Sequence, residues 1–204
     1  MHTYDRNYFK IALPAALEGL FMILLASTDL IMVGALGALS IAAVSIFMQP
    51  RLILLCFSRS LASSVTLLVS QKAGAGDTNG TSDIMKKSLT LCAIFMGLLH
   101  ILFYIFLDDI FYLMGANDEY MAEAMAYGPI ALAAVYVTSL TLILQAVQLG
   151  YGRTSVIMKT NVCGNVVNLA LNALLIFGFG PIPSLGVTGA AIGTLVSTIF
   201  TLTW

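Results

Sequence analysis

One otherwise apolar stretch of the sequence carries a row of four amides, Asn161, Asn165, Asn168 and Asn172. Offsets of four, seven and eleven residues place these side chains within about 60° on one face of an α-helix. An amide in a nonpolar environment is costly unless it is hydrogen-bonded, and one or two amides usually suffice to join helices. A row of four therefore indicates a hydrated cavity more than interhelical hydrogen bonding alone.

Two carboxylates, Glu18 and Asp29, lie in another apolar stretch. Their spacing of eleven residues is close to three helical turns, so both project from the same face. A charge at the centre of a membrane span costs about 2.5–3.5 kcal/mol on insertion scales, and such residues usually face a cavity or a partner. We expect Asp29 and the amide row to enclose one water-filled site whose oxygens suit H⁺ or Na⁺.

Arginines in the next apolar stretch offer a competing explanation for both carboxylates. Arg59 comes at a similar depth to Glu18, so a buried ion pair explains Glu18 as well as a cavity does. Arg51 begins a few ångströms deeper than Asp29 and could reach it. We favour a titrating or cation-binding Asp29 over a permanently paired one.

The elements that carry these side chains follow from composition. Of 204 residues, 59% are hydrophobic and only 9% are charged, whereas soluble domains carry about 25% charged residues. The apolar blocks are continuous and long enough to span a bilayer as helices, and they lack the short alternation of barrel strands. We therefore predict an all-α membrane protein with six transmembrane helices, at about 11–36, 41–70, 88–107, 124–150, 161–178 and 185–204.

Basic residues predict the orientation, because Lys and Arg concentrate in short cytoplasmic loops. Seven of the nine fall before the first span, between the second and third, or between the fourth and fifth. The third-to-fourth connection is acidic instead. The N-terminus is thus expected in the cytoplasm. The last block reaches Trp204 without a polar flank, which suggests a truncated chain.

Several function classes have no support in the sequence. A net charge of −1 without a long basic run argues against nucleic-acid binding. No phosphate loop, metal-ligand cluster or nucleophile–base arrangement is visible. We expect no enzyme activity, no cofactor and no metal beyond Na⁺ at the cation site.

The order of several motifs resembles the N-terminal half of multidrug and toxic compound extrusion (MATE) transporters over essentially the whole chain. The passages that carry the resemblance are Ala12-Leu13-Pro14, Ser27 to Gly34, Ala42-Ala43-Val44-Ser45, Val69-Ser70-Gln71, Gly74-Ala75-Gly76-Asp77, and Asn168 to Gly178 leading into Leu185 to Ala191. Each motif alone is modest. Their order and spacing together are specific.

The resemblance implies one six-helix lobe of a twelve-helix transporter in the bacterial inner membrane, whose second lobe is missing from this chain. Such transporters export small organic, often cationic drugs in exchange for H⁺ or Na⁺. Asp29 matches the family's acidic residue of the first helix, and Asn168 and Asn172 match its fifth-helix pair. The second of this pair is an aspartate in some members, so Asn172 leaves the coupling ion open. Gln145 matches a polar fourth-helix position, Thr194 a sixth-helix hydroxyl, and Pro14 the first-helix proline where some members bend.

Further residues are expected to line the cavity or to contact substrate: Glu18, Gln49, Asn161 and Asn165. A flippase for lipid-linked precursors in the same superfamily is the nearest alternative function, and it would need a more cationic cavity, for which Arg51 and Arg59 are candidates. A non-transporting truncated membrane protein is the other alternative. We expect no dye transport from this chain alone, because one lobe cannot form a two-sided cleft.

Overall fold

The computed structural model describes residues 13, 16–17, 19–20, 23–24, 27–181 and 183–204. Residues 27–34 are helical, whereas Pro14 and Glu18 lie outside the described residues. The helices with defined bounds are α2 (Ala38–Ile46), α3 (Met48–Gly74), α4 (Thr78–Ile105), α5 (Leu107–Leu113), α6 (Asp118–Gly150), α7 (Thr154–Phe177) and α8 (Gly186–Thr203).

Five helical stretches in the described part are long and apolar enough to cross a membrane. They are Ala38–Gly74, Thr78–Ile105, Asp118–Gly150, Thr154–Phe177 and Gly186–Thr203. Together with the helical segment at 27–34, they confirm the predicted all-α membrane fold.

A local interruption at Phe47 separates α2 from α3 within one span of 37 residues. Pro50 lacks a backbone N–H, so it cannot donate to the Ile46 carbonyl, and its ring crowds that oxygen. The ladder resumes one residue later, where the Arg51 N–H donates to the Phe47 carbonyl at 3.1 Å. The proline therefore explains the interruption between α2 and α3.

Several helices begin earlier than the apolar blocks suggest. α4 begins at Thr78, although its apolar block begins near residue 88, and α7 begins at Thr154 rather than near 161. At the start of α4, the Asp77 carboxylate accepts a hydrogen bond from the Gly80 N–H at 2.8 Å and caps the helix. Hydropathy marks only the part of a helix that is nonpolar, whereas backbone hydrogen bonding continues through its polar first turns.

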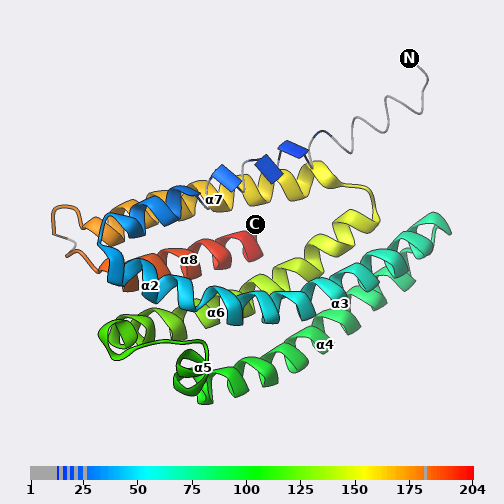
Figure 1. Cartoon of the computed structure of the whole chain (residues 1–204). Helices are drawn as coiled ribbons and strands as arrows, with labels where there is room; N and C mark the ends of the chain where they lie inside the picture. Colours follow the sequence, from blue (N-terminus) through cyan, green and yellow to red (C-terminus); the bar gives the residue numbers. More distant parts are fainter. Residues whose placement is uncertain (1–12, 14–15, 18, 21–22, 25–26, 182) are drawn as a thin grey trace.

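α6 is the central helix, in contact with every other helix from α2 to α8; Figure 1 shows it running between α8 and the α3–α4 pair. Two hydrogen bonds join it to α3: the Ser58 hydroxyl donates to Ser139 Oγ at 2.8 Å, and the Thr66 hydroxyl donates to the Ala146 carbonyl at 3.2 Å. The largest apolar cluster surrounds this seam. The Ser58, Ser139 and Thr66 hydroxyls at this seam are thus satisfied within the bundle.

A smaller apolar cluster joins the first helical segment to α2, α7 and α8 through Val33, Val44, Ile176, Val187 and Ala190. α7 and α8 lie side by side with the segment at 27–34 along α7 (Figure 1). Gly189 permits this close packing, because a Cβ there would lie 2.5 Å from the Leu175 carbonyl oxygen. The two apolar clusters leave a polar cavity between them.

Candidate functional site

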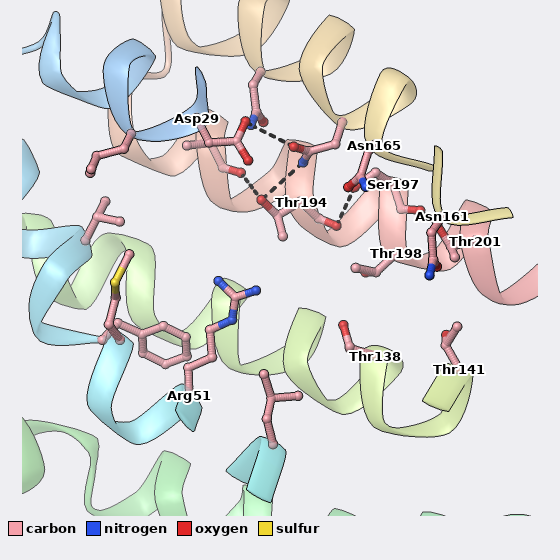
Figure 2. A pocket seen from close by; sticks show the side chains of 18 of the residues that line it. Asp29, Arg51, Thr138, Thr141, Asn161, Asn165, Thr194, Ser197, Thr198 and Thr201 are labelled. Carbon is pink, nitrogen blue, oxygen red and sulfur yellow. Dashed lines mark hydrogen bonds between the residues drawn. The ribbon is translucent and has the colours of Figure 1, made fainter. Parts of the chain in front are cut away.

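A cavity of about 430 Å³ lies between the end of the first helical segment, α3, α6, α7 and α8. This volume falls within the range of small-molecule sites. Its polar and charged lining residues are Asp29, Arg51, Arg59, Tyr127, Thr138, Thr141, Gln145, Asn161, Asn165, Asn168, Asn172, Thr194, Ser197, Thr198 and Thr201. Figure 2 shows Arg51, Thr138 and Thr141 on one wall and Asp29, Asn165 and Thr194 on the opposite wall.

Asp29 is held at one end of the cavity by the second amide of the fifth-span pair. Asn172 Nδ2 donates to Asp29 Oδ1 at 3.0 Å and to Asn168 Oδ1 at 3.2 Å. Asn168 and Asn172 are both buried, whereas Asp29 is partly exposed. The structure thus brings together a carboxylate and two amides from segments far apart in sequence.

The Asn168 amide fits two orientations. In one, its Nδ2 donates to Thr194 Oγ1 at 3.3 Å while its Oδ1 accepts from Asn172. In the other, its Nδ2 donates to Asp29 Oδ2 and Oδ1 at 3.1 and 3.2 Å, and its Oδ1 accepts from the Ser197 hydroxyl at 3.2 Å. The first orientation turns the amide oxygen toward the carboxylate. Because this sets two acceptors against each other, the hydrogen bonds around Asn168 favour the second orientation, in which its Nδ2 faces Asp29.

Close packing of α8 holds Asn172 in place. Its Oδ1 is buried without a hydrogen-bond partner among the described residues, and it lies against Gly193. A Cβ at Gly193 would collide with this oxygen. Because Gly193 lets Asn172 approach α8, the donor end of the amide is directed toward Asp29.

Gln145 stands apart from this group. Gln145 Nε2 donates to Asn161 Oδ1 at 2.6 Å, which links α6 to α7. Asn161 precedes Asn172 by eleven residues, about 16 Å along the axis at the standard rise. Asp29, Asn168, Asn172 and Thr194 therefore form one cluster, whereas Gln145 and Asn161 form a second one elsewhere in the same cavity.

The remaining candidates separate in the same way. Asn165 lines the cavity between the two clusters, and Arg51 and Arg59 line it from α3. Asp29 and Arg51 do not form an ion pair. Gln49 is exposed and is absent from the lining, because two residues along a helix turn the side chain about 200° away from Arg51. Glu18 and Pro14 lie outside the described residues.

Sequence reasoning missed a hydroxyl row on α8. Thr194, Ser197, Thr198 and Thr201 all line the cavity, yet only Thr194 was expected there. Their offsets of three, four and seven are the signature of one helical face, so the same periodicity argument that found the amide row could have found them. Where each of these hydroxyls donates to a carbonyl of its own helix, its oxygen can still accept a hydrogen bond, as Thr194 Oγ1 does from Asn168.

A comparison with protein-family models matches residues 14–174 to MatE. The chain belongs to the MatE family. Its curated relatives include the probable multidrug resistance protein NorM of Rhizobium meliloti, 28% identical over 193 residues, and an FAD transporter of Shewanella oneidensis, 27% identical over 203 residues. These matches cover 95% and 97% of this chain but 41% and 44% of the relatives.

Solved structures of MATE transporters show the same helix arrangement. A MOP superfamily transporter from Pyrococcus furiosus superposes with a TM-score of 0.87 at 25% identity, covering 97% of this chain and 43% of that one. The Vibrio cholerae MATE transporter VcmN superposes with a TM-score of 0.90 at 22% identity, over 97% of this chain and 44% of that one, and shows the fold alone. This MatE chain is therefore a multi-pass membrane protein that spans about two fifths of the length of these transporters, consistent with one lobe. It belongs to a family of transporters, not enzymes.

Proposed function

We propose that this lobe binds the coupling cation, H⁺ or Na⁺, of a multidrug efflux antiporter in the bacterial inner membrane. The observation that carries the proposal is the cluster of Asp29, Asn168 and Asn172. A carboxylate oxygen and amide oxygens are ligands that hard cations accept, and a carboxylate in a nonpolar surrounding can also take up a proton. The cluster also opens into a cavity large enough for a small organic molecule.

The hydrogen-bond donors around Asp29 suggest how the cation is recognised. With no cation beside Asp29, the Asn168 amide would donate to the carboxylate, which is the orientation that its surroundings favour. A cation beside Asp29 removes the need for that donor and favours the orientation in which Asn168 Oδ1 faces the carboxylate. The amide then donates to Thr194 instead. Cation binding would thus exchange hydrogen bonds between α7 and α8.

The side from which the cation enters follows from charge. The connections after α3 and after α6 lie at one end of the bundle (Figure 1) and carry or adjoin Lys72 and Arg153. Asn172 lies five residues before the end of α7, toward the opposite end. With basic ends in the cytoplasm, the Asp29 cluster would lie nearer the outside.

Transport by alternating access needs a cation and a substrate that each prefer one conformation over the other. Exchange of hydrogen bonds between α7 and α8 gives the cation such a preference, because these two helices form one wall of the cavity. Arrival of the cation would change the charge and hydration of that wall and lower the affinity for the outgoing molecule. The second lobe of the complete transporter would supply the facing half of the cleft.

The test is ethidium efflux from cells lacking their own pumps, using the complete transporter that contains this lobe. Asp29→Asn should abolish efflux that depends on the ion gradient while the protein still reaches the membrane. Asp83→Asn is the matched control, because Asp83 is exposed and pairs with Lys87 outside the cavity. Unimpaired, gradient-dependent efflux by Asp29→Asn would remove Asp29 from the mechanism.

A flippase for lipid-linked precursors is the second candidate, because Arg51 and Arg59 both line the cavity. A flippase of this kind moves a headgroup with negative charge through a polar cavity. Restoration of cell-wall precursor export in a flippase-deficient strain, with no effect on ethidium accumulation, would favour it over multidrug efflux.

A further inference from the structure

The wall of the cavity formed by α3 is cationic. Arg51, Leu55 and Arg59 line the cavity at successive spacings of four residues, so they lie one above another on one helical face. The two arginines are separated by about 12 Å along the helix. Figure 2 shows the Arg51 guanidinium pointing from α3 toward the wall that carries Thr194.

The Arg51 side chain is exposed and interacts with Asp29 and Tyr127 only through charge at longer range. Its guanidinium forms no hydrogen bond and no ion pair with any residue that the structure describes. Among the described lining residues, Asp29 is the single carboxylate, and it is already hydrogen-bonded to Asn172. A guanidinium carries five donors and no acceptor, so Arg51 presents unused donors to the cavity.

The facing wall has the opposite character. Thr194 and Thr198 on α8 donate to carbonyls of their own helix and leave oxygen acceptors toward the cavity. The wall formed by α8 therefore suits a cation, and the wall formed by α3 suits an anion. Among the described lining residues, two arginines and one carboxylate give the cavity an excess of positive charge, which favours a substrate that carries an anionic group.

We propose that Arg51 anchors a phosphate or carboxylate group of the transported molecule, so that this lobe accepts amphiphiles with an anionic head. The proposal rests on the proposed transport function and specifies its substrate class. Planar guanidinium groups bind such oxyanions through two parallel hydrogen bonds. Phe47 and Tyr127, whose rings pack edge to face at 5.8 Å, line the cavity beside Arg51 and supply an apolar surface for the rest of the molecule.

The test compares riboflavin 5′-phosphate with riboflavin, which differ only by the phosphate, on the purified chain in phosphatidylcholine nanodiscs. Quenching of flavin fluorescence reports binding. The phosphate should tighten binding about tenfold or more, since hydrogen bonds to charged groups are the strong ones. Arg51→Gln should reduce that difference to about twofold or less, and Arg51→Lys should retain part of it because the charge remains without the planar fork.

Lys86→Gln is the charge-matched control, because Lys86 is exposed near the start of α4 and lies outside the cavity lining. It should keep the full preference for the phosphate. Equal binding of the two flavins by the unchanged chain would overturn the proposal, and so would an Arg51→Gln variant that keeps the preference. The flavin-binding comparison tests Arg51 independently of Asp29. The efflux test decides separately whether Asp29 is the coupling residue.

A second set of nanodiscs distinguishes a soluble anion from a lipid headgroup. Adding phosphatidylglycerol should leave the preference for riboflavin 5′-phosphate intact if the natural ligand is a soluble molecule. Competition by phosphatidylglycerol that disappears in Arg51→Gln would support the same anion site with a lipid as its source. Competition that persists in Arg51→Gln would place the anion elsewhere and overturn the assignment to Arg51.

Discussion

Asn172 Nδ2 donates to Asp29 Oδ1 at 3.0 Å across 143 residues of sequence. This hydrogen bond connects the first helical segment to α7 at one end of the cavity. It also fixes one oxygen of the carboxylate and leaves the other facing the Asn168 amide. The position of the carboxylate therefore depends on the packing of α7 against α8.

Removal of the Asp29 charge should abolish stabilisation of the lobe by its cation. A cation that binds only the folded protein stabilises it by about 1.4 kcal/mol at ten times its Kd. For Na⁺, thermal unfolding of the purified chain in nanodiscs should shift upward with NaCl but not with choline chloride. Asp29→Asn should lose this shift and Asp83→Asn should keep it; a retained shift in Asp29→Asn would locate the cation elsewhere.

A methyl group at Gly193 should displace Asn172 and weaken the cation site. Gly193→Ala places a Cβ against Asn172 Oδ1, and overpacking of this kind costs about 1–3 kcal/mol. Gly97→Ala is the matched control, since its Cβ would lie at an ordinary 3.7 Å from the Tyr136 ring. For Gly193→Ala, both the free energy of unfolding and its increase with Na⁺ should fall. For Gly97→Ala, the free energy of unfolding should stay unchanged or rise, and its increase with Na⁺ should stay unchanged.

Loss of the α6–α7 amide contact should leave cation binding intact. Gln145→Leu removes the 2.6 Å hydrogen bond to Asn161, which lies about 16 Å along α7 from Asn172. The Na⁺- or pH-dependent stabilisation should persist in Gln145→Leu and be lost in Asn172→Leu. The reverse result would show that the coupling ion binds at the second polar cluster.

The Ser58–Ser139 hydrogen bond should contribute modestly to the α3–α6 seam. A double-mutant cycle with Ser58→Ala and Ser139→Ala should give a coupling energy of about 0.6 kcal/mol, the average for membrane helices. Ser64→Ala on the exposed side of α3 is the control, because Ser64 bonds only to its own helix. Coupling energy is measured from unfolding in a denaturing detergent, and a value near zero would show that the seam depends on apolar packing alone.

The Asp77 carboxylate that caps α4 should make the free energy of unfolding depend on pH. The hydrogen bond from the Gly80 N–H, followed by that from Lys72, lowers the pKa of the Asp77 carboxyl. Its stabilisation is fully present above the ordinary pKa of an aspartate and is lost as pH falls below that value through the lowered pKa. Asp77→Asn should flatten this part of the stability profile, whereas Asp83→Asn should not; an unchanged profile in Asp77→Asn would contradict the assignment.

The periodicity of apolar residues and the order of the motifs were sufficient to predict the membrane helices, the MATE relationship and the amide face of α7. Gln49 lies outside the cavity lining, because its side chain points to another side of the helix than Arg51 does. The resemblance grouped Gln145 with Asp29, but Gln145 bonds to Asn161 at another level of the same cavity, because a motif does not say at what level two helices cross. Helix bounds differed because polar first turns extend beyond the apolar blocks.

The sequence by itself determined that the chain lies in a membrane, that it is helical, and which side chains share a helical face. These properties depend only on composition and on the repeat of a single helix. Only the tertiary structure decided which polar residues meet. Asp29 meets Asn168 and Asn172 at one end of the cavity, and Gln145 meets Asn161 toward the other. Arg51 faces the cavity without a hydrogen bond or ion pair to any described residue. The reason is physical. Contacts between helices depend on their tilt and separation, which small residues such as Gly193 control through packing with distant segments.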